Sequence, residues 1–170
     1  MRNALLKSGL VAATLLAAGG AASAGTATSN LDVSATVAAS CTIDATGGLA
    51  FGTYDPVVTN KATALDGQGT INTVCTNGAT AVVTLDEGSH ADDASTPAAP
   101  VRRMLAGTNQ FLSYNLYTDN AHGTVWNGTT GQDVTGSGDN VATTVYGSIP
   151  AGQNASANTY NDTVKATITF

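Results

Sequence analysis

A strict alternation of apolar and polar side chains runs from Leu31 to Asp44. Every odd-numbered position is apolar, and every even-numbered position except Ala38 is polar. Successive side chains of a β-strand point to opposite faces, whereas an amphipathic helix repeats every 3.6 residues. The stretch therefore predicts extended chain with one apolar face. Its apolar positions are Leu31, Val33, Ala35, Val37, Ala39, Cys41 and Ile43.

The same period of two returns at the other end of the chain and in shorter runs between. At that end the apolar positions are Val164, Ala166, Ile168 and Phe170. The intervening runs predict strands at Gly69–Cys75, Thr80–Leu85, Phe111–Tyr117 and Val141–Ile149, with weaker patterns at Leu49–Phe51 and Val101–Leu105. Clusters of Gly, Asn, Asp and Pro separate these runs and are typical of turns. Seven or so short strands favour one all-β domain, an antiparallel β-sandwich of immunoglobulin-like type.

Composition supports a β fold and excludes one class of partner. The chain is rich in Thr and Gly, and Glu87 is its only glutamate. β-branched Thr suits a pleated sheet, while long helices favour Leu, Glu, Lys and Ala. The net charge of −6 over 170 residues argues against nucleic acid as a partner.

The first 24 residues resemble an export signal. Arg2 and Lys7 precede an uncharged apolar run at 8–20, and Ala22-Ser23-Ala24 follows with the small residues that signal peptidase requires. The apolar run is too short to span a bilayer. We therefore expect residues 1–24 to be a signal peptide cleaved after Ala24, with a retained membrane anchor as the alternative.

The chain has two cysteines, Cys41 and Cys75. In an oxidising compartment two cysteines normally pair. A disulfide would close a loop of about 35 residues and stabilise the fold by roughly 3.5–4 kcal/mol. No CxxC spacing is present and no His is near either Cys in sequence, so a catalytic or metal-binding role is disfavoured.

Two interpretations of the run at Leu31–Asp44 stay open, because it is longer than a usual strand. One is a single strand that bends from one sheet to the other. The other is a free arm over Leu31–Ala39, followed by a first strand that begins at Cys41. If Cys41 is bonded to Cys75, the body begins near Cys41. The arm, about 30 Å long when extended, could then complete the sheet of another molecule.

Several motifs resemble the spore coat protein U domain family, which includes rod subunits of archaic chaperone–usher pili. Early in the chain they are Cys41-Thr42-Ile43, Phe51-Gly52-Thr53-Tyr54-Asp55-Pro56 and Val74-Cys75-Thr76-Asn77-Gly78. Later ones include Arg102-Arg103-Met104, Leu112-Ser113-Tyr114-Asn115-Leu116-Tyr117, Thr124-Val125-Trp126, Val145-Tyr146-Gly147-Ser148-Ile149-Pro150-Ala151-Gly152-Gln153 and Tyr160-Asn161-Asp162-Thr163-Val164. Their order and spacing cover nearly all of residues 41–170.

The resemblance implies a sandwich that lacks its final strand and is completed by a donor strand from another subunit. Residues 25–40 would be the donor-strand extension and residues 41–170 the pilin domain. A periplasmic chaperone would first lend a strand, and an outer-membrane usher would then exchange it for the extension of an identical or related pilin. The expected plugs are Leu31, Val33, Ala35, Val37 and Ala39. The expected groove-edge strand, which pairs first with the chaperone, contains Val164, Ala166, Ile168 and Phe170.

The resemblance also implies a location and a role: a cell-surface pilus that supports adhesion and biofilm formation. Tip adhesins in such systems carry an added receptor-binding domain, for which this chain has no room, so a rod subunit is favoured. Two alternatives are an exported coat protein that assembles differently and a stand-alone carbohydrate-binding or adhesive module.

The remaining candidate residues favour a structural role over chemistry. His90 and His122 lie in Gly- and Asp-rich sequence, and the acidic pairs Asp86-Glu87 and Asp92-Asp93 lack the spacing of a calcium loop. No GxSxG nucleophile motif occurs. We expect no enzyme activity, no catalytic residue, no metal and no cofactor. The larger aromatics are expected in the core and on sheet faces rather than in a sugar-binding platform: Tyr114, Tyr117, Trp126 and Tyr146.

Overall fold

The computed structural model describes residues 23–170, so the predicted signal peptide lies outside the described residues except for its last two positions. Residues 36–170 form one compact unit. Within the described part all regular structure is β-strand, and no helix there is long and apolar enough to cross a membrane.

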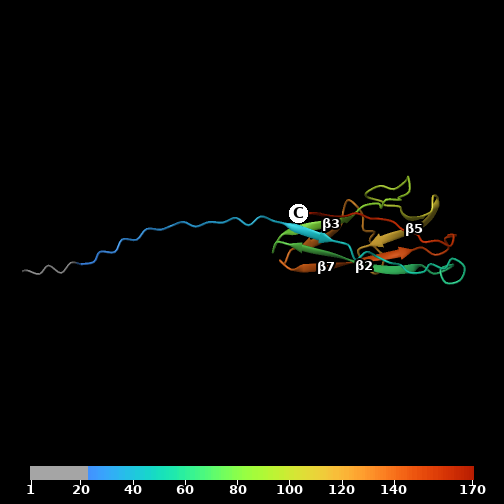
Figure 1. Cartoon of the computed structure of the whole chain (residues 1–170), viewed down its shortest axis with the longest axis horizontal. Helices are drawn as coiled ribbons and strands as arrows, with labels where there is room; N and C mark the ends of the chain where they lie inside the picture. Colours follow the sequence, from blue (N-terminus) through green and yellow to red (C-terminus); the bar gives the residue numbers. More distant parts are fainter. Residues whose placement is uncertain (1–22) are drawn as a thin grey trace, which may run out of the picture. The chain divides into compact units, whose positions relative to one another are not determined.

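Eight strands form two antiparallel sheets that pack face to face (Figure 1). The five-stranded sheet has the order β1-β2-β7-β5-β4, and the three-stranded sheet has the order β6-β3-β8. The strands are β1 (Cys41–Asp44), β2 (Leu65–Cys75), β3 (Thr80–Leu85), β4 (Arg102–Ala106), β5 (Gln110–Tyr117), β6 (Gln132–Thr135), β7 (Asn140–Ile149) and β8 (Ala166–Thr169). The all-β, immunoglobulin-like sandwich expected from the sequence is confirmed.

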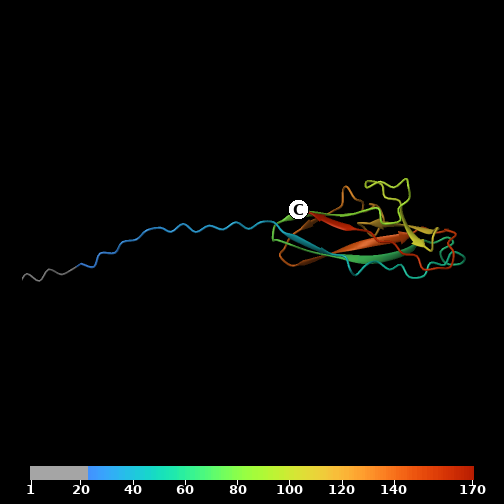
Figure 2. The same ribbon diagram turned by 45° about the horizontal axis from the view of Figure 1, so that its top comes forward.

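The two longest strands, β2 and β7, pair with each other inside the larger sheet (Figure 2). Their register runs from Leu65 opposite Ile149 to Val74 opposite Asn140. Side chains on their inner faces, such as Ile71 and Val145, are buried, whereas Asp66, Gln68 and Thr70, which point outward from β2, are polar and exposed. This alternation is the pattern that predicted the strands.

Between the sheets lies a single apolar core. Trp126 is fully buried and its indole N–H donates to the carbonyl of Val83 on β3 at 2.8 Å. This bond satisfies the one polar atom of the largest core side chain, as a buried indole requires. The other buried core residues are Ile71, Val83, Leu85, Leu112, Tyr114, Leu116, Val134, Val145 and Ile149.

One predicted strand is wrong, one is shorter than predicted, and the others are found with small shifts. β3 has the predicted bounds, β5 and β7 begin one residue earlier, β4 is shifted by one residue, and β2 begins four residues earlier. Leu49–Phe51 is not a strand, since only one bridge joins Leu49 to Gly69. At the C-terminal end only Ala166–Thr169 of the predicted Val164–Phe170 is strand. Strand β6 was not predicted, because Val134 is its only apolar residue.

The long alternating run is not one strand. Only Cys41–Asp44 pairs with a neighbour, and residues 23–40 contain no strand and are exposed throughout. Of the two interpretations left open, the structure therefore has a separate segment before a first strand at Cys41. We call residues 25–40 the arm.

Candidate functional site

An apolar groove opens between two chain segments, residues 45–57 and residues 155–166, over the edge of the core. It contains two adjoining cavities of about 340 and 880 Å³, which share Leu49, Phe51, Met104, Tyr160 and Asn161 in their linings. The smaller cavity is also lined by Ile71, Leu85, Leu116, Val145, Val164 and Ala166. The larger is also lined by Tyr54, Pro56, Val57, Leu112, Ile149 and Ala155.

The two ends of the groove differ. At one end, which we call the root end, the start of β1 and the C-terminus lie together (Figures 1 and 2). At the other, the loop end, the loops around Val57 and Gly152 gather, joined by Gly152 N–H to the carbonyl of Asn60 at 2.8 Å. The chain runs from root end to loop end through residues 45–57 and returns through residues 155–166.

Along the groove the core is only partly covered. A row of apolar side chains packs against the buried core yet stays half-exposed, in contrast to the fully buried residues between β3 and β7. Apolar surface left open to water costs free energy in proportion to its area. The row comprises Ile43, Leu49, Phe51, Tyr54, Met104, Ala155, Tyr160, Val164, Ala166 and Ile168.

Two facing glycines of the larger sheet leave room for the wall of the groove that residues 45–57 form. Gly67 on β2 lies opposite Gly147 on β7. A Cβ on Gly147 would lie 2.8 Å from the Phe51 ring and 2.9 Å from Leu49, too close for real contacts. The missing side chains thus leave the space that Leu49 and Phe51 occupy. Sequence patterning alone could not reveal this, because these glycines resemble ordinary strand interruptions.

The other wall of the groove, over residues 155–166, has backbone groups whose hydrogen bonding alternates from one residue to the next. Asn161 exchanges two hydrogen bonds with Leu105, Thr163 accepts from Ser89, and Lys165 bonds to Asp86. Within residues 23–170, no hydrogen bond forms at the backbone groups of Tyr160, Asp162 and Val164. Odd-numbered residues therefore bond into the domain, while even-numbered ones keep free donors and acceptors, as at the edge of a sheet.

The side-chain carboxyl of Asp162, a residue of this wall, is buried beneath the groove. The Asp162 side chain is only 3% exposed, accepts from the Tyr114 hydroxyl at 2.7 Å and lies 2.9 Å from His90 Nδ1. Burial, then the hydrogen bond and charge of Asp162, raise the pKa of Tyr114 far above its ordinary value. Tyr114 therefore stays protonated and serves as a fixed donor to Asp162.

Arg102 joins the two sheets beside this carboxyl. Its buried guanidinium donates to the carbonyls of Leu85, Asp86 and Trp126, at 3.1, 2.6 and 2.8 Å through its Nη2. Burial lowers the pKa of Arg102, and the nearby Tyr114 and acidic groups oppose that shift. These bonds tie β4 of the larger sheet to the end of β3 in the smaller one.

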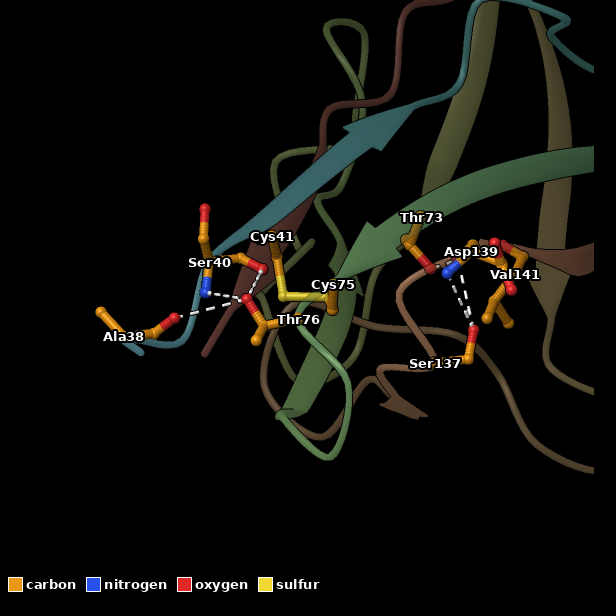
Figure 3. The surroundings of a disulfide bond; sticks show 9 residues. All are labelled: Ala38, Ser40, Cys41, Thr73, Cys75, Thr76, Ser137, Asp139 and Val141. Carbon is orange, nitrogen blue, oxygen red and sulfur yellow. Dashed lines mark hydrogen bonds between the residues drawn. A yellow bond between two sulfur atoms is a disulfide. The ribbon is translucent and has the colours of Figure 1, made fainter. Parts of the chain in front are cut away.

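A disulfide and one threonine hold the root of the arm (Figure 3). Cys41, the first residue of β1, is bonded to Cys75, the last residue of β2, which is the pairing that the sequence predicts. Beside it, Thr76 N–H donates to the carbonyl of Ser40 at 2.9 Å, and Ser40 N–H donates to Thr76 Oγ1 at 3.1 Å. The arm therefore leaves the body from a fixed point.

The structure places the predicted site residues as follows. Leu31, Val33 and Val37 are 87, 87 and 82% exposed, and Ala35 and Ala39 are also exposed. Val164 and Ala166 line the groove, Ile168 packs on the core edge, and Phe170 is 57% exposed. Sequence reasoning missed the wall over residues 155–163, because its Ser, Asn and Asp content resembles a loop. The alternation that could have revealed it extends back only to Val164, because Asp162 is polar.

The polar residues considered for chemistry are bound within the fold. Asp92 forms an ion pair with Arg103 at 2.8 Å, and His122 stacks on Tyr117. In the described residues, no three His, Cys, Asp or Glu side chains are grouped so that they could hold a metal ion. Trp126 and Tyr114 are in the core, whereas Tyr117 and Tyr146 pair on the outer face of the larger sheet.

Comparison with known proteins yields one family, one relative and one solved structure. The family model of the Spore Coat Protein U domain matches residues 27–167. "Protein U" of Myxococcus xanthus is 46% identical over 169 residues, which is 95% of this chain and 94% of that protein. A chain in the crystal structure of the CsuC–CsuE chaperone–tip adhesion subunit pre-assembly complex, from archaic chaperone–usher Csu pili of Acinetobacter baumannii, gives a TM-score of 0.49 at 18% identity. That match covers 79% of this chain and 40% of the other.

Proposed function

Because the chain belongs to the Spore Coat Protein U domain family, we propose that it is a structural subunit of a surface pilus that polymerises by donor-strand exchange. In this proposal it is not an enzyme. The arm of each subunit fills the groove of its neighbour and completes the neighbour's sandwich, and the polymer supports adhesion and biofilm formation.

The observation that carries the proposal is the match between an open groove and an exposed arm in one chain. The groove offers half-covered apolar side chains and free backbone groups at Asp162 and Val164. The arm offers apolar side chains at every second position, and those at Leu31, Val33 and Val37 are exposed. A strand inserted in the groove would cover the apolar side chains and bond to the free backbone groups at the same time. β-Strand addition gains affinity and specificity in this way.

The energy of such a joint is large for a non-covalent contact. Full burial of a Leu or Val side chain contributes roughly 1.5–3 kcal/mol, and Ala contributes less. Three large plugs and a backbone ladder together support a linkage that resists dissociation. Ala35 and Ala39 would contribute shape more than apolar area.

Export and assembly would follow the route of the family's pilus members. Residues 1–24 direct the chain to the periplasm, where a chaperone covers the groove and pairs first with the edge containing Val164, Ala166, Ile168 and Phe170. An outer-membrane usher then exchanges the chaperone's strand for the arm of the next subunit. The subunit thereby reaches the cell surface as part of the pilus.

The second candidate is a coat protein that assembles by another contact, which the family's name favours. In that case the arm need not enter a groove. The two candidates differ in one property: only donor-strand exchange requires the apolar face of the arm.

We therefore test the two faces of the arm with matched charges. Val33→Asp puts a carboxylate among the plugs, whereas Ser34→Asp puts the same group one residue further along on the outward face. Polymer length in extracts of the exported full chain is measured by sedimentation and electron microscopy. We expect Val33→Asp to abolish polymers and Ser34→Asp to retain them, with both bodies folded by circular dichroism. Equal polymer yields from the two variants would reject donor-strand exchange and leave the coat-protein alternative.

A further inference from the structure

We propose that Asp32 of one copy pairs with Lys165 of the next copy, and that this ion pair sets the register of the arm in the groove. The inference rests on the proposed function, since it concerns a second copy of this chain as the occupant of the groove. It goes further by naming which arm residue lies opposite which wall residue.

The charges of the two surfaces single out this pair. Asp32 is the only charged residue in the arm, and Lys165 is the only cation in residues 155–170. Lys165 is exposed, and within the described residues neither side chain forms an ion pair. Asp162 is the one other charged residue of this wall, and its side chain is buried.

The fixed root of the arm determines the direction of insertion. Residues 31–39 extend over about 30 Å, and Ser40 is already held by Thr76, so little slack separates the donor segment from its own body. The donor's body must therefore lie where its arm leaves the groove. An exit at the root end would put that body where the acceptor's own arm begins. An exit at the loop end leaves the start of the acceptor's own arm unobstructed. Leu31 therefore lies toward the root end and Ala39 toward the loop end.

This direction makes the arm antiparallel to the wall, which runs from residue 155 at the loop end to residue 166 near the root end. In an antiparallel pair, residues with backbone groups toward the partner bond to the residues directly opposite them. The free groups are on Asp162 and Val164, and the side chains of these even-numbered residues face the groove. The odd-numbered plugs of the arm must lie opposite them.

Three registers satisfy these conditions and bring Asp32 close to Lys165. In them Asp32 lies opposite Thr163, Lys165 or Thr167. Only the second places opposite charges side by side. It falls on a non-hydrogen-bonded pair, where the Cα atoms approach to about 4.5 Å and side chains lie closest. Opposite charges at such positions stabilise a sheet, and like charges destabilise it.

The same register suits the side chains that face the groove. With Asp32 opposite Lys165, Leu31 lies opposite Ala166 and Val33 opposite Val164, in the smaller cavity. Ala35 then lies opposite Asp162, where a methyl group leaves the hydrogen bond with Tyr114 undisturbed. A slip of two residues in either direction would press Val33 or Val37 against that buried carboxyl.

Cysteine cross-linking of the full chain measures the register directly. Asp32→Cys is combined with Lys165→Cys, with Thr163→Cys or with Thr167→Cys, and assembled material is oxidised mildly and run on denaturing gels without reductant. The native disulfide lies within one chain and gives no ladder. We expect a ladder of covalent oligomers chiefly from the Asp32→Cys and Lys165→Cys combination.

The outcomes separate the register from the proposed function. Polymers that cross-link chiefly through Thr163→Cys or Thr167→Cys would overturn the register while keeping donor-strand exchange. Polymers that cross-link at none of the three positions would overturn the register as well. Failure of the unsubstituted chain to form polymers would instead contradict the proposed function itself.

A charge exchange tests whether the pair contributes to recognition. Asp32→Lys and Lys165→Asp are each expected to slow polymerisation about two- to five-fold, because cross-strand ion pairs of this kind are modest. The double variant should recover most of the original rate. Asp32→Lys with Lys61→Asp is the matched control, since Lys61 is an exposed lysine at the loop end, and it should give no recovery. Recovery in the control, or none in the exchange, would reject the pairing.

Discussion

The hydroxyl of Tyr114 is the fixed donor on which the floor of the groove depends. It donates to Asp162 at 2.7 Å in a place where the Tyr114 side chain is buried and the Asp162 side chain is 3% exposed. We predict that Tyr114→Phe lowers the free energy of unfolding by about 1–3 kcal/mol, because a buried acceptor then loses its partner. Urea unfolding followed by circular dichroism measures the loss. Tyr117→Phe, on the outer face, should change stability by less than about 0.5 kcal/mol.

The same residue predicts how stability depends on alkaline pH. The pKa of Tyr114 is raised in the folded protein, chiefly by burial, so only the unfolded chain ionises this phenol near its ordinary pKa of about 10. The contribution of Tyr114 to stability is therefore complete below pH 10 and declines as the pH rises further. Tyr114→Phe should lose less stability than the unsubstituted chain between pH 9 and pH 11. Parallel curves would contradict the assignment.

At the scale of elements, the wall over residues 45–57 depends on an absence of side chains beneath it. The facing glycines Gly67 and Gly147 leave room for Leu49 and Phe51. We predict that Gly147→Ala costs about 1–3 kcal/mol in stability, because the added methyl group would lie 2.8 Å from the Phe51 ring and displace it. Gly123→Ala is the control, since its Cβ would meet Asp119 at an ordinary 3.5 Å. Thermal unfolding compares the two.

A displaced Phe51 should also impair the groove. Polymerisation of the Gly147→Ala variant is expected to slow even at temperatures where it remains folded. Normal assembly by a destabilised Gly147→Ala variant would show that this wall does not contact the donor.

The elements that the sequence predicted well are those that bury one face. Strand β3 has the predicted bounds because Ala81, Val83 and Leu85 are buried at alternate positions. Strand β6 has one buried residue, Val134, and its pairing depends on β3, a partner distant in sequence. The wall at residues 155–163 is organised by long-range bonds, such as Asn161 with Leu105, that no local pattern encodes.

The candidate site likewise has a part that could be predicted from the sequence and a part that could not. The apolar face of the arm could be predicted from the sequence because alternation identifies such a face even where nothing covers it, as at Leu31 and Val33. The lining of the groove could not, because Phe51, Met104 and Tyr160 line it together although they lie far apart along the chain. The glycine pair and the Tyr114–Asp162 bond belong to this second group.

At the scale of the whole molecule, the body and the arm both leave apolar side chains without a complete core. The body folds around a core that stays half-covered along the groove, and the arm has apolar side chains with no core of their own. In the proposed polymer each chain supplies what its neighbour lacks. The disulfide at Cys41 and Cys75 separates the two parts at the point where the arm leaves the body.

Removal of residues 25–39 tests this division of the molecule. We predict that the shortened chain cannot polymerise but keeps an open groove, so a peptide of residues 30–40 should bind and stabilise it. At a peptide concentration a hundred times its dissociation constant, binding contributes about 2.7 kcal/mol, which raises the melting temperature by roughly 10 °C. A peptide with Val33→Asp and Val37→Asp is the control and should give no shift. A shortened chain that is a stable monomer, with the same melting temperature with and without the native peptide, would mean that its groove needs no strand.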